Sequence, residues 1–166
     1  MALTVVQPGV GGTGNANLTF PNVTGTVMVS GNMPTFCYTQ NSTTAVSSAT
    51  FTKVNFQAAN FDTTSGMYSS SRFTPTIAGY YQINGGVGVA TVPTRVIAAI
   101  YRSGSIYSYG NDCGAATTVN TGITSGIVYC NGTTDYVEMW VYFGTGQNTA
   151  ASVTQTYFSG AMVRTA

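Results

Sequence analysis

The sequence contains no histidine, and only nine of its 166 residues are charged: five Lys or Arg and four Asp or Glu. Without histidine the chain cannot form a Ser-His-Asp triad, a Cys-His pair or an imidazole ligand to a metal ion. The four carboxylates are Asp62, Asp112, Asp135 and Glu138, and a paired-carboxylate site or a calcium cage would need most of them. We therefore predict that the protein is not an enzyme and binds neither a metal nor a cofactor.

Long apolar runs and basic clusters are missing too. No run approaches the roughly 18 apolar residues of a membrane span, and the nearest candidate is Val96–Tyr101. A net charge of +1 from five scattered bases provides no footprint for nucleic acid. The first residues, MALTVVQP, have no basic segment followed by an apolar one, as a secretory signal would. These absences predict a protein that is made in a cytoplasm and binds neither nucleic acid nor membrane.

Cysteine is scarce, and the number of cysteines is odd. The three cysteines, Cys37, Cys113 and Cys130, show no CxxC spacing, which argues against a zinc site or a closed disulfide framework. Cys37 and Cys130 lie in strand-like runs, so we expect buried, small apolar side chains. The sequence leaves a Cys37–Cys130 or Cys113–Cys130 bridge open.

Leucine occurs only twice, whereas valine occurs 18 times and threonine 28 times. β-Branched residues fit a pleated sheet, and no segment shows the helical period over 11 residues. From about Met33 onward, strand-like runs alternate with turn signals at intervals near 10 residues, which is typical of a sandwich or barrel. Residues 53–58, 95–103 and 135–143 are the clearest predicted strands, and the second of them is apolar on both faces.

Residues 1–34 differ from the rest of the chain, because they contain no charged side chain and are broken by clusters such as Gly11-Gly12-Thr13-Gly14. They are too apolar to stay free in water and too rich in glycine to fold alone. We predict an extended anchoring arm over 1–34 and a head domain over 35–166, and a disordered leader remains the alternative. The candidate anchoring residues are Val5, Val6, Pro8, Val10, Leu18, Phe20, Val27 and Val29.

The predicted strands expose more apolar surface than a monomer tolerates. Over residues 135–143 the aromatic side chains of Tyr136, Trp140 and Tyr142 share one face without a neighbouring lysine. A chain with almost no net charge also lacks the repulsion that keeps copies apart. The sequence therefore predicts an obligate oligomer.

Four separated motifs resemble a known family. Phe61–Tyr68 (FDTTSGMY) and Pro75–Tyr81 (PTIAGYY) resemble two signatures of the globular head of complement's first component. Val128–Val141 resembles its penultimate strand pair, and Tyr157–Gly160 resembles its final strand. The resemblance spans residues 35–164 and implies an all-β fold, a two-sheet antiparallel jelly-roll sandwich shared with the tumour-necrosis-factor superfamily and assembled as a homotrimer. The chain has no collagen-like stalk and no acid cluster for calcium, so the functions of the animal members do not carry over.

The segment Val10–Asn15 (VGGTGN) resembles pieces common in bacteriophage fibre and virion proteins. Combined with a trimeric head, it predicts a capsid decoration (cement) or head-fibre protein. Such a protein is made in the host cytoplasm and held by its arm on the major capsid protein at the virion surface. The alternative is a fibre tip that binds a host-surface glycan.

That alternative rests on Tyr101–Cys113, predicted to form a surface loop in which Tyr107 and Tyr109 stack on sugar rings and Asn111 donates hydrogen bonds. Trp140 is a further candidate for stacking. The competing interpretation of this segment is a strand and turn packed at the trimer seam.

Overall fold

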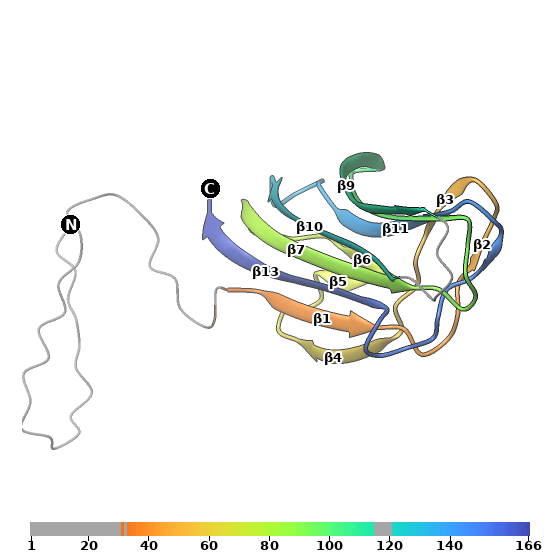
Figure 1. The fold of residues 1–166 in the computed structure, drawn as a ribbon. Helices are drawn as coiled ribbons and strands as arrows, with labels where there is room; N and C mark the ends of the chain where they lie inside the picture. The colour runs from red at the N-terminus through yellow and green to blue at the C-terminus, as the bar shows by residue number, and fades with distance from the viewer. Residues whose placement is uncertain (1–30, 32, 115–120) are drawn as a thin grey trace, which may run out of the picture.

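β-Strands make up the regular structure of the residues that this computed structural model describes, which are 31, 33–114 and 121–166 (Figure 1). No α-helix occurs in this part of the chain, as the composition predicts. In chain order the strands are β1 (Thr35–Thr39), β2 (Ala45–Val46), β3 (Thr50–Lys53), β4 (Ala58–Asp62), β5 (Tyr68–Ser69), β6 (Arg72–Phe73), β7 (Gly79–Gly88), β8 (Arg95–Arg102), β9 (Ser105–Gly114), β10 (Thr121–Cys130), β11 (Val137–Phe143), β12 (Gln147–Asn148) and β13 (Tyr157–Thr165).

The strands form two five-stranded antiparallel sheets. The first sheet has the order β10-β7-β13-β1-β4, and the second has the order β5-β6-β11-β8-β9. The short pair β12-β2 stands apart from both. Figure 1 shows the strands of the first sheet side by side, with β9 and β11 of the second sheet behind them. This arrangement confirms the predicted two-sheet antiparallel sandwich.

Aromatic side chains fill the layer between the sheets. Phe36 of the first sheet lies 4.7 Å, between ring centroids, from Phe73 of the second. Phe158 and Tyr81 complete the cluster, at 5.0 Å from Phe36 and 5.2 Å from Phe73 respectively. All four are fully buried, and the Tyr81 hydroxyl donates a hydrogen bond of 2.7 Å to the Ile77 carbonyl. Burial of such side chains is the main stabilising contribution in a chain with so few charges.

Strand β8 is buried on both faces, as its sequence predicts. Val96, Ala98 and Ile100 lie in the core between the sheets. Ile97 and Tyr101 point away from the core but are also buried. Other side chains must therefore cover Ile97 and Tyr101 on the outer face of the second sheet.

Two turns within the motif segments are held by side-chain hydrogen bonds to the backbone. After β4, Asp62 Oδ1 accepts the Thr64 N–H at 2.7 Å, and Gly66 takes a φ of +88°, which favours glycine. Before β11, Asn131 Oδ1 accepts the backbone N–H groups of residues 133, 134 and 135. These bonds satisfy backbone donors that no strand partner reaches.

Both ends of the head lie at the same end of the first sheet. The Met162 N–H donates to the Pro34 carbonyl at 3.1 Å, directly before β1. The Ala166 N–H donates to the Ala78 carbonyl at 3.1 Å, directly before β7. The start of β1 and the C-terminus therefore lie near each other.

The predicted strand over residues 53–58 is wrong, because β3 ends at Lys53 and β4 begins at Ala58. Val54 and Phe56 are buried as the alternation predicts. However, the Val54 N–H donates to Met139 of the second sheet, whereas β4 pairs with β1 of the first. The segment crosses between the sheets, so it cannot stay in one ladder.

The open question about the cysteines is resolved by their positions. Cys37, Cys113 and Cys130 are all free thiols. Cys130 is fully buried as predicted, whereas the prediction is wrong for Cys37, which is only partly buried because it alternates with the core residue Phe36 on β1. Burial raises the pKa of the Cys130 thiol to about 12. It is therefore a small core side chain and not a nucleophile.

Candidate functional site: the two outer faces of the sandwich

The candidate anchoring residues Val5, Val6, Pro8, Val10, Leu18, Phe20, Val27 and Val29 lie outside the described residues. The described part of the chain offers two surfaces with a distinct chemistry. One is the outer face of the first sheet, and the other is the outer face of the second sheet.

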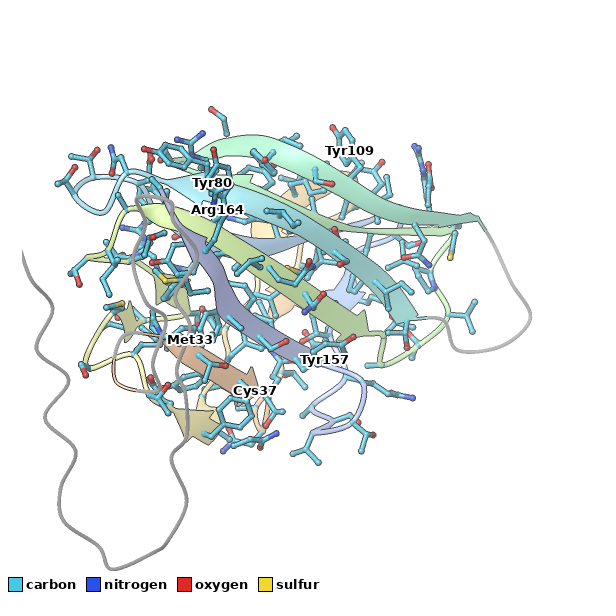
Figure 2. All side chains as sticks on the ribbon, turned by 90° about the vertical axis from the view of Figure 1, so that its left-hand side faces the viewer. Met33, Cys37, Tyr80, Tyr109, Tyr157 and Arg164 are labelled. Atoms are coloured by element: carbon cyan, nitrogen blue, oxygen red, sulfur yellow. The ribbon has the colours of Figure 1, made fainter. Side chains whose placement is uncertain are left out.

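The outer face of the first sheet is called here the first-sheet face. It carries apolar side chains and neutral polar side chains but almost no charged ones. On β10 the side chains of Ile123 and Ile127 are 52% and 51% exposed, while their neighbours Thr124 and Val128 point into the core. Other side chains of this face are Cys37, Tyr80, Gln82, Asn84, Ser125, Tyr129, Tyr157, Ser159, Ala161 and Arg164. Figure 2 looks onto this face and shows Tyr80 and Arg164 together at one end, with Tyr157 and Cys37 nearer the other.

The polar groups of the first-sheet face bond to one another across the strands. Ser125 Oγ donates to Asn84 Oδ1 at 2.8 Å and accepts from Gln82 Nε2 at 2.9 Å. The rings of Tyr80 and Tyr129 lie 5.4 Å apart, and the Arg164 guanidinium lies 5.7 Å from the Tyr80 ring. The Gln82, Asn84 and Ser125 side chains thus satisfy one another, which lowers the desolvation cost of burying this part of the face.

The outer face of the second sheet has the opposite character. Glu138 on β11 is buried and accepts hydrogen bonds from Arg72 Nε at 2.7 Å, Trp140 Nε1 at 3.0 Å and Lys53 Nζ at 3.1 Å. The Tyr101 ring stacks on Trp140 at 4.4 Å. A carboxylate with this many charge-assisted partners tolerates burial.

Next to this network an aromatic hollow of about 390 Å³ opens on the same face. We call it the β3–β9 hollow, after two of the strands that form it. Its lining residues are Phe51, Arg95, Ile97, Tyr109, Gly110, Asp112 and Tyr142. The Phe51 ring lies 5.8 Å from Tyr109 and 5.5 Å from Tyr142. Arg95 Nε donates to Asp112 Oδ1 at 2.8 Å, and Arg95 Nη2 donates to Asp112 Oδ2.

The predicted surface loop over Tyr101–Cys113 is wrong, because the segment forms a hairpin of β8 and β9. This agrees with the competing interpretation of a strand and turn, whose place at a trimer seam stays a prediction. Ser103 and Gly104 take positive φ values, as the two central residues of a tight hairpin turn do. Tyr107, Tyr109 and Asn111 therefore lie on a strand. Regular alternation would place these three side chains on one face, but two register shifts in the β8–β9 ladder interrupt it, so that Tyr109 faces another way than Tyr107 and Asn111. The strand is formed by its backbone ladder with the buried strand β8, which runs from Arg102↔Ser105 to Arg95↔Gly114, although no side chain of β9 is fully buried.

Two of those three residues connect β9 to β10. The Tyr107 hydroxyl donates to the Ile127 carbonyl at 2.8 Å. Asn111 Oδ1 accepts the Ile123 N–H, and its amide donates to the Thr121 carbonyl at 3.4 Å. A Cβ at Gly110 would collide with the Ile123 carbonyl, so the two strands need a glycine there. Tyr109 is different: it is 58% exposed and its ring borders the β3–β9 hollow.

All four carboxyl groups have lowered pKa values. For Asp112 and Asp135 the first cause is a hydrogen bond from Arg95 or Arg102. Burial alone would raise the pKa of Glu138, but the bonds from Arg72, Trp140 and Lys53 outweigh it. Asp62 behaves likewise, with bonds from Thr64 and Tyr38 against burial. A lowered folded-state pKa stabilises the fold above the unfolded value and loses that effect as the pH falls.

We therefore expect the free energy of unfolding to be constant from about pH 5.5 to 7.5 and to fall below about pH 4.5. As the pH falls, the carboxylates bind protons in the unfolded chain before they do so in the folded chain, which favours unfolding. The flat region follows from the absence of histidine. Differential scanning calorimetry across this range measures the effect. A transition in stability centred near pH 6.5 would contradict this account.

In residues 31, 33–114 and 121–166, no three His, Cys, Asp or Glu side chains lie closely enough together to hold a metal ion. Across the same residues, no helix has the length and apolar character to cross a membrane.

Comparison with known proteins establishes the fold. No family model matches the chain, and no curated protein matches its sequence. Among solved structures, the globular domain of the zebrafish complement 1qA protein matches with a TM-score of 0.62 and 14% identity, over 81% of this chain and 100% of that one. The Eiger TNF of S. frugiperda matches with a TM-score of 0.65 and 8% identity, over 81% of this chain and 94% of that one.

The PRD1 vertex protein P5 also matches, with a TM-score of 0.58 and 14% identity, over 80% of this chain and 96% of that one. At these identities the likeness concerns the fold alone. It confirms the jelly-roll sandwich, and with it the resemblance to complement heads and tumour-necrosis-factor proteins that the four sequence motifs indicate.

Proposed function

We propose that the chain is a structural protein of a virion, a capsid decoration or head-fibre protein. In this proposal three copies assemble through the first-sheet face, and residues 1–34 bind the major capsid protein. The observation that carries it is the unequal distribution of charge. Of the described charged residues, Arg164 is the only one on the first-sheet face, whereas seven lie on the second sheet or beside it: Lys53, Arg72, Arg95, Arg102, Asp112, Asp135 and Glu138.

An exposed sheet face without charge is suited to burial against another copy. Ile123, Ile127 and Tyr129 form an apolar row on β10, and contiguous apolar surface of this kind marks an interaction site. Burying it removes apolar area from water at no cost in buried charge. A vertex protein with the same fold, PRD1 P5, supports a virion role, and complement and TNF proteins with this fold support the jelly roll as its scaffold.

The position of the arm fits attachment to a surface. Residues 1–30 join the head at one end of the first sheet. Rotational symmetry then places three arms at the same height along the axis, facing one side. An uncharged, β-prone arm can pair with exposed strand edges of a shell, and three linked arms multiply weak contacts.

Co-sedimentation with undecorated capsids of the virus tests this proposal. We expect saturable binding at three chains per site, with little change between about 0.1 and 1 M NaCl because the arm contains no charge to screen. Tailless shells that are already decorated serve as the control. Failure to bind undecorated shells, or binding that salt abolishes, would overturn the anchoring role.

The β3–β9 hollow favours a second candidate function, that of a fibre tip that binds a host-surface polysaccharide. Aromatic rings around a hollow with polar groups at its rim are typical of small-ligand sites. Of the three residues that the sequence analysis singled out for this function, only Tyr109 borders the hollow.

A further inference from the structure

We infer that the β3–β9 hollow binds a neutral sugar ring of a polysaccharide, held between the aromatic rings of Phe51, Tyr109 and Tyr142 and hydrogen-bonded by Arg95 and Asp112. The inference rests on the second candidate function, carbohydrate binding, and not on how the chain assembles. It places the contact on one surface of the second sheet, where four strands separated in sequence meet.

The walls of the hollow are apolar and rigid. Phe51 comes from β3, Tyr109 from β9 and Tyr142 from β11, and Ile97 of β8 forms part of the lining. Ile97 pairs with Tyr142 on one side and with Asp112 on the other, so these three side chains point to the same face. The C–H faces of a pyranose ring pack on such rings, which lose little rotamer entropy when they bind.

The rim of the hollow is polar. The Arg95 and Asp112 side chains are each 49% exposed, so the ion pair faces solvent and a ligand can reach it. A guanidinium carries five N–H donors, of which Asp112 takes two, and the carboxylate keeps free lone pairs. Sugar hydroxyls both donate and accept, and adjacent donors and acceptors in a fixed geometry match a pair of neighbouring hydroxyls.

The charges in the hollow argue for a neutral ligand. Three aromatic rings and a carboxylate would suit a quaternary ammonium ion, but Arg95 already neutralises Asp112 and lies 5.7 Å from the Tyr142 ring. The guanidinium therefore already makes the interactions with the carboxylate and the aromatic ring that a cationic ligand would make. An anion gains as little, because Asp112 repels it from Arg95. The volume of about 390 Å³ lies within the range of about 300–1,000 Å³ for small-ligand sites.

Saturation-transfer NMR on the full chain tests the inference with the methyl glycosides of glucose, galactose, mannose and rhamnose as probes. Choline and adenosine serve as cationic and nucleobase comparisons. We expect transfer to the C–H protons of at least one glycoside, with a dissociation constant on the order of 1–10 mM, and none to choline. Tyr109→Ala should reduce glycoside affinity about tenfold, and Asp112→Asn should reduce it roughly threefold to tenfold.

Phe61→Ala is the matched control, because Phe61 is 50% exposed on β4 of the other sheet and outside the hollow. Thermal unfolding of each variant verifies that it folds, and both test residues are exposed enough to be replaced without a cavity. Equal transfer in Tyr109→Ala and Phe61→Ala, or transfer to choline but not to any glycoside, would overturn the inference.

A parallel assay with polysaccharide extracted from the host cell surface tests separately whether the β3–β9 hollow is the binding site and whether the chain binds polysaccharide at all. If the chain binds the polysaccharide and Tyr109→Ala binds it equally, the hollow is not the site, although the fibre-tip function stands. If the chain binds neither the glycosides nor the polysaccharide, both the site and that function fall.

Discussion

The Ile123→Glu variant is expected to scatter light as a monomer of 17.3 kDa, whereas under the proposed function the unaltered chain should scatter at about three times that mass. Ile123 lies at the N-terminal end of the apolar row on β10 and points out of the first-sheet face. In the monomer its side chain is more than half exposed, so a glutamate there meets water and the head still folds. In the assembly the same carboxylate is buried without a partner.

The expected effect is large because each trimer contains the substitution three times. An unpaired buried charge costs several kcal/mol, so that even about 3 kcal/mol per interface weakens each contact more than a hundredfold. Arg164 is the only described cation on the first-sheet face, and it lies beside Tyr80 at the end of the face. Tyr80 pairs with Tyr129, and Ile123 lies toward the opposite end of β10, so Arg164 is too remote to pair with the new carboxylate. Multi-angle light scattering at micromolar protein, followed by dilution, measures the change.

Val92→Glu is the matched control for this experiment. Val92 is an exposed valine in the loop between β7 and β8, so the substitution adds the same charge away from the face. It should leave the assembly at its native mass. A native chain that scatters as a monomer, or an Ile123→Glu variant that keeps the native mass, would contradict assembly through this face.

The fold could be predicted from the sequence where one short segment determines the outcome. Alternation over β11 and the apolar run of β8 each fix a strand without reference to the rest of the chain. The turn motif around Asp62 and Gly66 is equally local, since its hydrogen bond spans two residues. The strand predicted over residues 53–58 is wrong although Val54 and Phe56 are buried in alternation. The segment bonds to the second sheet at Val54 and continues into β4 of the first sheet, and a local pattern does not show this change of sheet.

The β3–β9 hollow could not be predicted, because its aromatic side chains come from three strands that span residues 51 to 142. No local pattern marks Phe51 or Tyr142 as neighbours. One part of the site did have a signal. In an unbroken hairpin, a two-residue turn at Ser103-Gly104 sets Arg95 opposite Asp112, and the two register shifts in β8–β9 leave them diagonal but still paired. The signal is the opposite charge of Arg95 and Asp112, and a neutral glutamine or asparagine at either of these positions would not have indicated that the two side chains pair.

The largest loss of binding is expected from deletion of residues 1–30. Under the proposed function, the arm makes the contact with the shell and the head does not, so the shortened chain should no longer co-sediment with undecorated capsids. The deletion stops before Met33 because the Pro34 carbonyl accepts the Met162 N–H and belongs to the head. Loss of three linked contacts at once lowers the apparent affinity by far more than tenfold, since the contribution of effective concentration disappears with them.

The same preparation provides the controls that make the deletion informative. Light scattering should still give the mass of three shortened chains, and the melting temperature should stay near that of the full chain, because no described hydrogen bond of the head involves a residue before Pro34. A milder variant, Val5→Asp with Val6→Asp, keeps the length of the arm and adds charge at two predicted contact positions. It should weaken binding to the shell and make it dependent on salt. If the shortened trimer binds capsids as tightly as the full chain, the head itself makes the contact, and the first-sheet face or the β3–β9 hollow becomes the surface to map.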